Sequence, residues 1–309
     1  MTDNVLTPKN ARLAAETEMG AVTLKVADLD NMIRYYTQAL PLEVTAQQGS
    51  SAIIGRGQRP LVILEHSPEL QHASPRAAGL FHTAILFETE TALAAAVYAV
   101  AKYAPNSFTG SSDHLVSKAF YFNDPEGNGI ELYWDRDRSE WSWVHGQVEM
   151  DSLFLDPNQY LKDYMTEEAM QDPVIGDAMI GHVHLQVGDI ESAQKFYVDW
   201  LGFEATKANF PGALFVSAGG YHHHMAMNVW NSRGSGRRDK TLGLGEVDIV
   251  LPTKDEIGEI AERVKHYGVQ VADDGQTLSF EDPWANVLRI QTAEAQPFTV
   301  FYGATKNRP

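Results

Sequence analysis

The sequence contains no cysteine, which excludes disulfide bonds and metal sites with thiolate ligands. Basic residues are also scarce, because 24 lysines and arginines stand against 41 aspartates and glutamates, for a net charge of −17. A nucleic-acid-binding surface needs clustered positive charge, so we expect no nucleic-acid partner. This balance says little about small substrates.

Long apolar runs are missing as well. No stretch approaches the 18 or so uninterrupted apolar residues that span a membrane. The opening residues, MTDNVLTPKNARLAAE, hold no apolar run of the kind found in a signal peptide. We therefore expect a cytoplasmic protein with no membrane partner. A chain of 309 residues can bury one large core or two modest ones, and we expect two.

An internal repeat organises the chain. Residues 21–43 align without a gap with residues 182–204 (Val22 with Val183, Leu24 with Leu185, Asp28 with Asp189, Tyr36 with Tyr197). In both segments apolar and polar residues first alternate as in a strand, and a helical pattern then follows the aspartate. Residues 79–103 resemble residues 243–267 in the same way. The Asp-Pro turns in NDPEGNGIELYW and EDPWANVLRIQT each lead into a further strand. Four strand–helix–strands units therefore begin near residues 20, 80, 180 and 244.

This pattern resembles the vicinal oxygen chelate superfamily, which includes glyoxalases, bleomycin resistance proteins and extradiol dioxygenases. The resemblance implies an α+β fold in which four βαβββ modules form two domains with curled mixed sheets around a metal cavity. We expect an N-terminal domain at residues 18–136, a connector at 137–178, a C-terminal domain at 179–295 and a tail at 296–309.

Residues 114–135, HLVSKAFYFNDPEGNGIELYWD, carry the most specific motif. The segment is similar to the fingerprint of catechol 2,3-dioxygenase-type extradiol dioxygenases at seven spaced positions (His114, Phe120, Tyr121, Asp124, Pro125, Gly127 and Glu131). Ser112, two residues before the histidine, departs from it. A bare Asp-Pro-x-Gly turn would be weak support, whereas seven matched positions in one module are strong support.

Strand periodicity predicts which polar side chains face a cavity, because residues two apart share one face of a sheet. In GIELYW, Ile130 and Leu132 should pack on helices, so Glu131 should point into the cavity. A buried carboxylate needs a neutralising partner such as a cation. By the same rule, we expect the side chains of His182 and His184 to face the cavity. In GYHHHMAMNVW we expect the same of His222 and His224. A one-residue bulge would exchange His224 for His223.

The resemblance implies that two first-strand histidines and one last-strand glutamate bind the metal. Module two retains His82 and Glu131, and module three retains His182. Modules one and four instead carry Ala21, Glu246 and Arg289 at the ligand positions, where Arg289 should pair with Glu246 or Asp248. Pairing modules two and three is what completes a triad. We therefore expect a site across the middle of the chain or between subunits.

The function implied by the resemblance is extradiol cleavage of a catechol by O₂ at Fe(II). Mn(II) is also possible, because oxygen and imidazole ligands do not discriminate sharply between Fe(II) and Mn(II). His224 would act as the acid–base residue, and His114 and Tyr121 would hydrogen-bond the substrate oxygens. The product would be of the 2-hydroxymuconate semialdehyde type. The expected partners are a small aromatic diol and O₂, and we expect a homo-oligomer.

Three alternatives share the fold. A glyoxalase-like lyase or isomerase would use nickel or zinc, with His224 as a fourth ligand, and a thiol transferase is a weaker form of the same idea. A non-enzymatic small-molecule-binding member needs no metal, which would leave the inward-facing ligand residues unexplained. The motif with His114, Tyr121 and Glu131 favours the dioxygenase.

Overall fold

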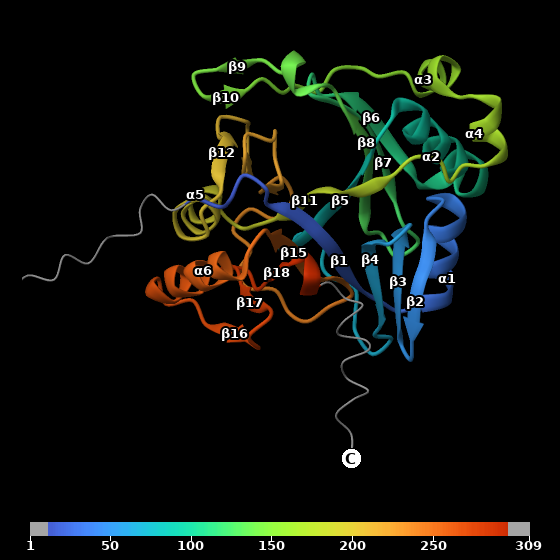
Figure 1. The fold of residues 1–309 in the computed structure, drawn as a ribbon. Helices are drawn as coiled ribbons and strands as arrows, with labels where there is room; N and C mark the ends of the chain where they lie inside the picture. The colour runs from blue at the N-terminus through green and yellow to red at the C-terminus, as the bar shows by residue number, and fades with distance from the viewer. Residues whose placement is uncertain (1–11, 296–309) are drawn as a thin grey trace, which may run out of the picture.

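The computed structural model describes residues 12–295, which form two eight-stranded mixed β-sheets with helices packed against them (Figure 1). A two-stranded ribbon, β9 (Trp143–Val144) and β10 (Gln147–Val148), pairs with neither sheet and lies against β12. The expected tail, residues 296–309, lies outside the described residues.

Each sheet combines one module from either half of the chain. The outer-module sheet contains modules one and four in the order β16 (Val271–Asp273), β17 (Leu278–Glu281), β18 (Val287–Thr292), β15 (Gly243–Leu251), β1 (Glu18–Val26), β4 (Arg59–His66), β3 (Ser51–Arg56) and β2 (Glu43–Gln48). The inner-module sheet contains modules two and three in the order β12 (Glu204–Lys207), β13 (Ala213–Ser217), β14 (Met225–Asn228), β11 (Ala178–Gln186), β5 (Gly79–Phe87), β8 (Gly129–Asp135), β7 (Ser117–Asn123) and β6 (Phe108–Asp113). Residues 18–136 therefore supply one module to each of the two sheets, and residues 179–295 do the same.

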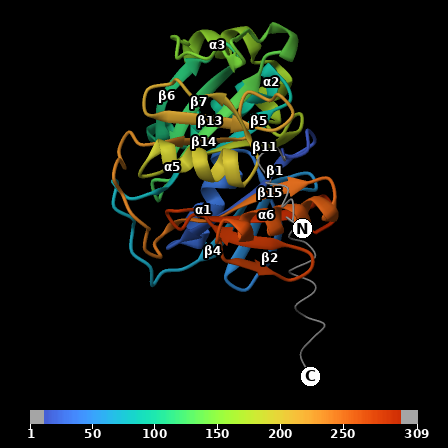
Figure 2. The same cartoon turned by 90° about the vertical axis from the view of Figure 1, so that its left-hand side faces the viewer.

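The first strands of the modules join the halves of each sheet. Strand β1 pairs antiparallel with β15, and β5 pairs antiparallel with β11. Within each module the first strand pairs parallel with the last one. Figure 2 shows β5, β11, β1 and β15 gathered at the centre of the molecule, where strands of the two sheets also contact one another. The inferred pairing of module two with module three is confirmed.

Each first strand leads into a helix that begins at a capping side chain. The helices are α1 (Leu29–Arg34), which continues as η1 (Tyr35–Ala39), α2 (Glu90–Tyr103), α5 (Ile190–Gln194), which continues as η4 (Lys195–Trp200), and α6 (Lys254–His266). Oxygens of Asp28, Thr89, Asp189 and Thr253 accept hydrogen bonds from backbone N–H groups of the first turns. The aspartates expected at helix starts therefore serve as N-caps.

The connector supplies two short helices, α3 (Pro157–Tyr164) and α4 (Glu167–Gln171), which lie against α2. Three short 3₁₀ helices are η2 (Pro105–Ser107), η3 (Arg138–Glu140) and η5 (Ala293–Ala295). Among residues 12–295, no helix has the length and apolar character needed to cross a lipid bilayer.

Side chains alternate across the strands of the inner-module sheet as the sequence predicts. Val183 and Leu185 on β11 are fully buried in the main apolar core, together with residues of the helices. Ile130 and Leu132 on β8 belong to the same core. The residues between them therefore emerge on the opposite face of the sheet, which is where a cavity can form.

The Asp-Pro turns of the repeat tie the two sheets together. Asp124 accepts hydrogen bonds from its own turn and, at 3.2 Å, from the hydroxyl of Tyr36 in module one. Asp282 accepts an equivalent bond of 2.9 Å from Tyr197 in module three. Because modules one and four lie in one sheet and modules two and three in the other, these tyrosine–aspartate bonds cross between the sheets. Burial raises the pKa of Asp124 to about 6, against the lowering effect of its hydrogen bonds.

Candidate metal centre

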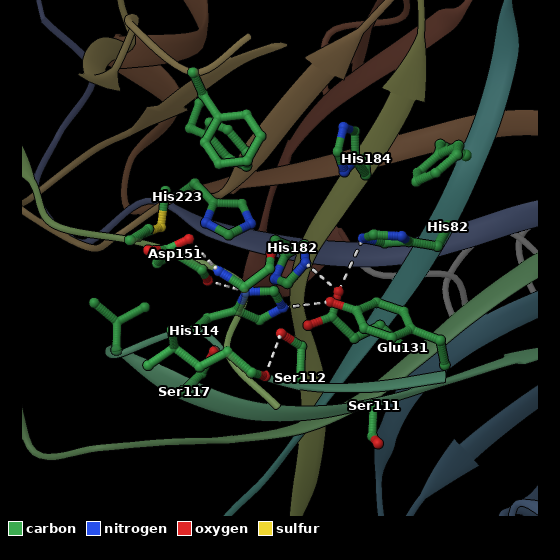
Figure 3. A pocket seen from close by; sticks show the side chains of 18 of the residues that line it. His82, Ser111, Ser112, His114, Ser117, Glu131, Asp151, His182, His184 and His223 are labelled. Atoms are coloured by element: carbon green, nitrogen blue, oxygen red, sulfur yellow. Dashed lines mark hydrogen bonds and ion pairs between the residues drawn. The ribbon is translucent and has the colours of Figure 1, made fainter. Parts of the chain in front are cut away.

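Three neighbouring strands of the inner-module sheet bring His82, Glu131 and His182 together. His82 lies on β5, Glu131 on β8 and His182 on β11, and all three side chains are buried. Nε2 of His82 lies 3.0 Å from Oε2 of Glu131, and Nε2 of His182 lies 3.2 Å from the same oxygen. Figure 3 shows both imidazoles pointing at the carboxylate. Within residues 12–295, this is the one group of three potential ligands whose donor atoms all lie within 4.8 Å.

The distances in this cluster fit a divalent cation. Two ligands that each lie about 2.1 Å from a metal ion, at right angles to one another, are about 3.0 Å apart. The buried Nε2 of His82, although close to Glu131, makes no hydrogen bond of acceptable geometry with any described residue. A metal ion would give this nitrogen a partner. The residues present therefore fit a two-histidine, one-carboxylate metal site.

The protonation states also suit metal binding. Burial by itself raises the pKa of Glu131, but the adjacent imidazoles of His182 and His82 outweigh burial and hold that pKa well below its ordinary value. Burial lowers the pKa of His182 to about 4, against the opposing effect of Glu131. Near neutral pH the carboxylate is therefore ionised and the His182 imidazole is neutral, which are the forms that bind metals.

A cavity of about 500 Å³ opens in front of the triad. One side is aromatic and contains Phe81, Phe210, Phe215 and Trp230. Residues 150–154 of the connector cover another side, although their sequence shows no periodicity that would predict this position. Leu153 makes two backbone hydrogen bonds with Asp113, the last residue of β6, and these bonds hold the connector against the sheet.

His114 and Tyr121 form a hydrogen-bonded pair in the wall of this cavity. Tyr121 lies on β7 directly across from Glu131, and His114 lies in the turn between β6 and β7. Nδ1 of His114 is 2.7 Å from the carbonyl oxygen of Asp151, so this nitrogen carries a proton and donates it. In a neutral imidazole Nε2 then accepts the hydrogen bond from the Tyr121 hydroxyl, at 2.6 Å. Burial raises the pKa of Tyr121 well above its ordinary value, and Glu131 raises it further, so the hydroxyl keeps its proton.

The orientation expected for the three consecutive histidines is wrong. His223 lines the cavity of the triad, whereas His224 faces a separate cavity beside Arg138 and Tyr221. Strand β14 begins at Met225, so residues 222–224 precede it and do not follow strand alternation. Nδ1 of His224 instead accepts a hydrogen bond of 3.1 Å from the backbone N–H of Ala218. Because His224 faces a different cavity from the triad, the structure does not support His224 as a fourth metal ligand.

His184, which the sequence turns inward without a role, also lines the cavity. Its Nε2 lies 3.1 Å from the side-chain amide of Asn228, and its ring packs edge-on against that of His82. Burial lowers the pKa of His184 well below its ordinary value. His184 therefore packs against the His82 ring as a neutral side chain.

Comparisons with known proteins agree with this geometry. The profile of the Glyoxalase/Bleomycin resistance protein/Dioxygenase superfamily matches residues 18–132 and 179–290. The chain is 35% identical over 274 residues to a catechol-2,3-dioxygenase from Bacillus subtilis (strain 168), covering 87% of this chain and 94% of the relative. The chain belongs to this superfamily.

Solved structures of other members share the fold at low identity. A Bacillus subtilis protein matches with a TM-score of 0.63 at 13% identity, covering 94% of this chain and 88% of that one. Glyoxalase I from Zea mays matches with a TM-score of 0.55 at 16% identity, covering 90% and 92%. These two likenesses support the modular fold alone.

In this superfamily member the outer-module sheet holds an ion pair at the positions that correspond to the triad. Nε of Arg289 is 2.8 Å from Oδ1 of Asp248 and 3.2 Å from Oε1 of Glu246. Nη2 of Arg289 makes a second bond to Asp248, at 2.6 Å. Ala21 is buried against Ile53 and Ile63. The expectation that Arg289 pairs with Glu246 or Asp248 is confirmed for both, with Asp248 as its register partner.

Replacing Arg289 by alanine should destabilise the protein without removing its metal. The change leaves the fully buried Asp248 without its guanidinium partner, and breaking a buried pair from one side costs roughly 3–5 kcal/mol. We expect the melting temperature to fall by on the order of 5–10 °C. Differential scanning calorimetry and elemental analysis of the folded protein measure the two effects.

Arg237→Ala is the matched control, because Arg237 pairs with Glu281 at the exposed surface. An exposed ion pair contributes about 0–1 kcal/mol, so this variant should melt close to the wild type. Loss of the metal in folded Arg289→Ala would instead place a functional site in the outer-module sheet.

Proposed function

We propose that the protein is an extradiol dioxygenase that opens the ring of a catechol beside its hydroxyl groups. Both atoms of O₂ enter the product, which is of the 2-hydroxymuconate semialdehyde type. The observation that carries this proposal is the His82–Glu131–His182 cluster at one end of an aromatic-lined cavity. The relative named a catechol-2,3-dioxygenase supports it.

We assign the metal to His82, His182 and Glu131, a ligand set of two imidazoles and one carboxylate that is diagnostic of non-haem Fe(II) oxygenases. Fe(II), or Mn(II) in its place, would leave coordination positions open and bring the two catechol oxygens and O₂ side by side. The stretch of β-sheet beneath these ligands makes the site rigid, which favours a fixed geometry for the reacting groups.

The other polar groups of the cavity supply proton transfer and hydrogen bonds. His223 is the side chain best placed to accept a proton from a catechol hydroxyl and later to return it, in the role that we expected of His224. Tyr121 keeps its proton, and its one O–H can turn from Nε2 of His114 to donate a hydrogen bond to a substrate oxygen. His114 holds the Tyr121 hydroxyl toward the cavity. Hydrogen bonds of this kind stabilise negative charge that develops during the reaction.

The charge of the cavity favours a catechol without an anionic substituent. Of the lysines and arginines in residues 12–295, none lines the cavity, whereas Glu131 and Asp151 do. A substituent carboxylate would therefore lose water without gaining a cationic partner, which costs several kcal/mol. The four aromatic side chains instead favour an apolar ring substituent.

Oxygen uptake by metal-reconstituted protein tests this function. After anaerobic loading with Fe(II), catechol and 4-methylcatechol should each consume about one O₂ per molecule, with a new absorbance from the ring-opened product. The kcat/KM for 3,4-dihydroxybenzoate should be lower by about 100-fold or more, as expected for an unpaired buried charge.

The uncharged 3,4-dihydroxybenzamide is the matched control, because it has nearly the same shape and also withdraws electrons from the ring. The amide should react much faster than the carboxylate. Equal rates for the two would contradict the charge argument alone. Failure of the Fe(II)- and Mn(II)-loaded protein to consume O₂ with any of the four diols would contradict the dioxygenase itself.

A further inference from the structure

A chain of buried hydrogen bonds runs from His223 away from the cavity. Nδ1 of His223 lies 2.7 Å from Nδ1 of His222, and Nε2 of His222 lies 2.8 Å from Oδ1 of Asp135. Asp135 is the last residue of β8, the strand that also carries Glu131. The His222 side chain is almost fully buried, so solvent does not compete for either nitrogen.

These contacts determine where each imidazole carries its proton. An ionised carboxylate only accepts hydrogen bonds, so Nε2 of His222 donates to Asp135. A neutral His222 then has a lone pair on Nδ1 and accepts from Nδ1–H of His223. Nε2 of His223 is left without a proton.

Ring packing keeps His223 in this orientation. The His223 ring lies against that of His182, with centroids 4.1 Å apart, and meets Phe215 edge-on at 5.0 Å. The hydrogen bond to His222 engages Nδ1 on one side of the ring, so the opposite edge is the one available to the cavity. Figure 3 shows the His223 ring beside that of His182 at the cavity.

We propose that Asp135 and His222 are positioning residues that hold His223 with its proton on Nδ1 and the lone pair of Nε2 available to substrate. The proton-transfer part of this inference rests on the proposed function. A catechol O–H bond breaks, its proton passes to Nε2 of His223, and the electron pair stays on the catechol oxygen. The imidazolium that forms is stabilised through His222 by the Asp135 carboxylate, as a buried aspartate stabilises histidine in serine hydrolases.

Asp135→Asn is the decisive variant, because it retains the shape of the side chain and reverses the direction of the hydrogen bonds. The amide NH₂ would donate to Nε2 of His222, which moves the His222 proton to Nδ1 and the His223 proton to Nε2. The amide oxygen can still accept from the hydroxyl of Tyr221, which is 2.7 Å from Oδ2 of Asp135. We expect kcat to fall by about 100-fold or more, with KM and metal content near the wild-type values.

Tyr221→Phe is the matched control, because it removes an equally short hydrogen bond to the same carboxylate without touching the bond to His222. This variant should keep most of the wild-type kcat. Asp135→Glu, which restores a carboxylate, should recover part of the activity that Asp135→Asn loses. If Asp135→Asn and Tyr221→Phe lost activity equally, or if Asp135→Asn kept the wild-type kcat, the positioning role would be overturned.

Nitrogen NMR of histidine-labelled protein loaded with Zn(II) tests the same inference without turnover. Wild-type His223 should show a protonated Nδ1 and an unprotonated Nε2, and Asp135→Asn should show the reverse. A proton on Nε2 of wild-type His223 overturns the inference, even if the variant fails to fold. The expected spectra in a protein that cleaves none of the diols would uphold the hydrogen-bond chain and refute the dioxygenase.

Discussion

Replacing Glu131 by alanine should remove both the metal and the activity. Oε2 of Glu131 lies 3.0 Å from Nε2 of His82 and 3.2 Å from Nε2 of His182. The Glu131 carboxylate carries the negative charge of this three-residue site. Two buried neutral imidazoles alone bind a divalent cation far more weakly, because no anion remains to offset its charge. Elemental analysis after anaerobic reconstitution should show about one metal per chain in the wild type and at least about tenfold less in the variant.

Glu246→Gln is the control for this experiment. Glu246 occupies the position of module four that corresponds to His82 and pairs with Arg289, so the change removes a half-buried carboxylate from the other sheet. This variant should keep the metal content and the oxygen uptake of the wild type. Circular dichroism establishes that each variant is folded. A full complement of metal in folded Glu131→Ala would refute the triad as the metal site.

Replacing His223 by phenylalanine should leave the metal in place and abolish most turnover. His223 lines the cavity but lies outside the group of convergent ligand atoms, so its loss removes proton transfer and not coordination. General acid–base catalysis contributes about 10²–10⁴ to the rate, and kcat should fall by that factor. Steady-state oxygen uptake and metal analysis of the same preparation give the two quantities.

His224→Phe is the neighbouring control. Its Nδ1 accepts one backbone hydrogen bond from Ala218, so the change should cost about 1 kcal/mol of stability and little activity. If His224→Phe lost turnover while His223→Phe kept it, the placement of the two side chains would be wrong. If His223→Phe lost its metal as completely as Glu131→Ala, His223 would be a fourth ligand and a lyase would become the better interpretation.

Much of the fold and of the candidate metal site was predictable from local sequence. The gapless repeat identified the four modules, because helix caps and strand alternation depend on residues only a few positions apart. Alternation placed Glu131 and His182 on the cavity face because both lie inside regular strands. The ligand residues missing from modules one and four indicated that modules two and three pair.

Only the tertiary structure decided the rest of the site. His223 replaces His224 in the cavity because the chain is irregular before Met225, where alternation has no physical basis. Asp151 and the connector around it cover the cavity through contacts that local periodicity does not encode. Asp135 meets His222 across 87 positions of sequence, because the curled sheet brings the end of β8 against the segment before β14. Sequence periodicity thus determined which face a strand residue occupies, while packing between distant segments determined which of the three consecutive histidines lines the cavity.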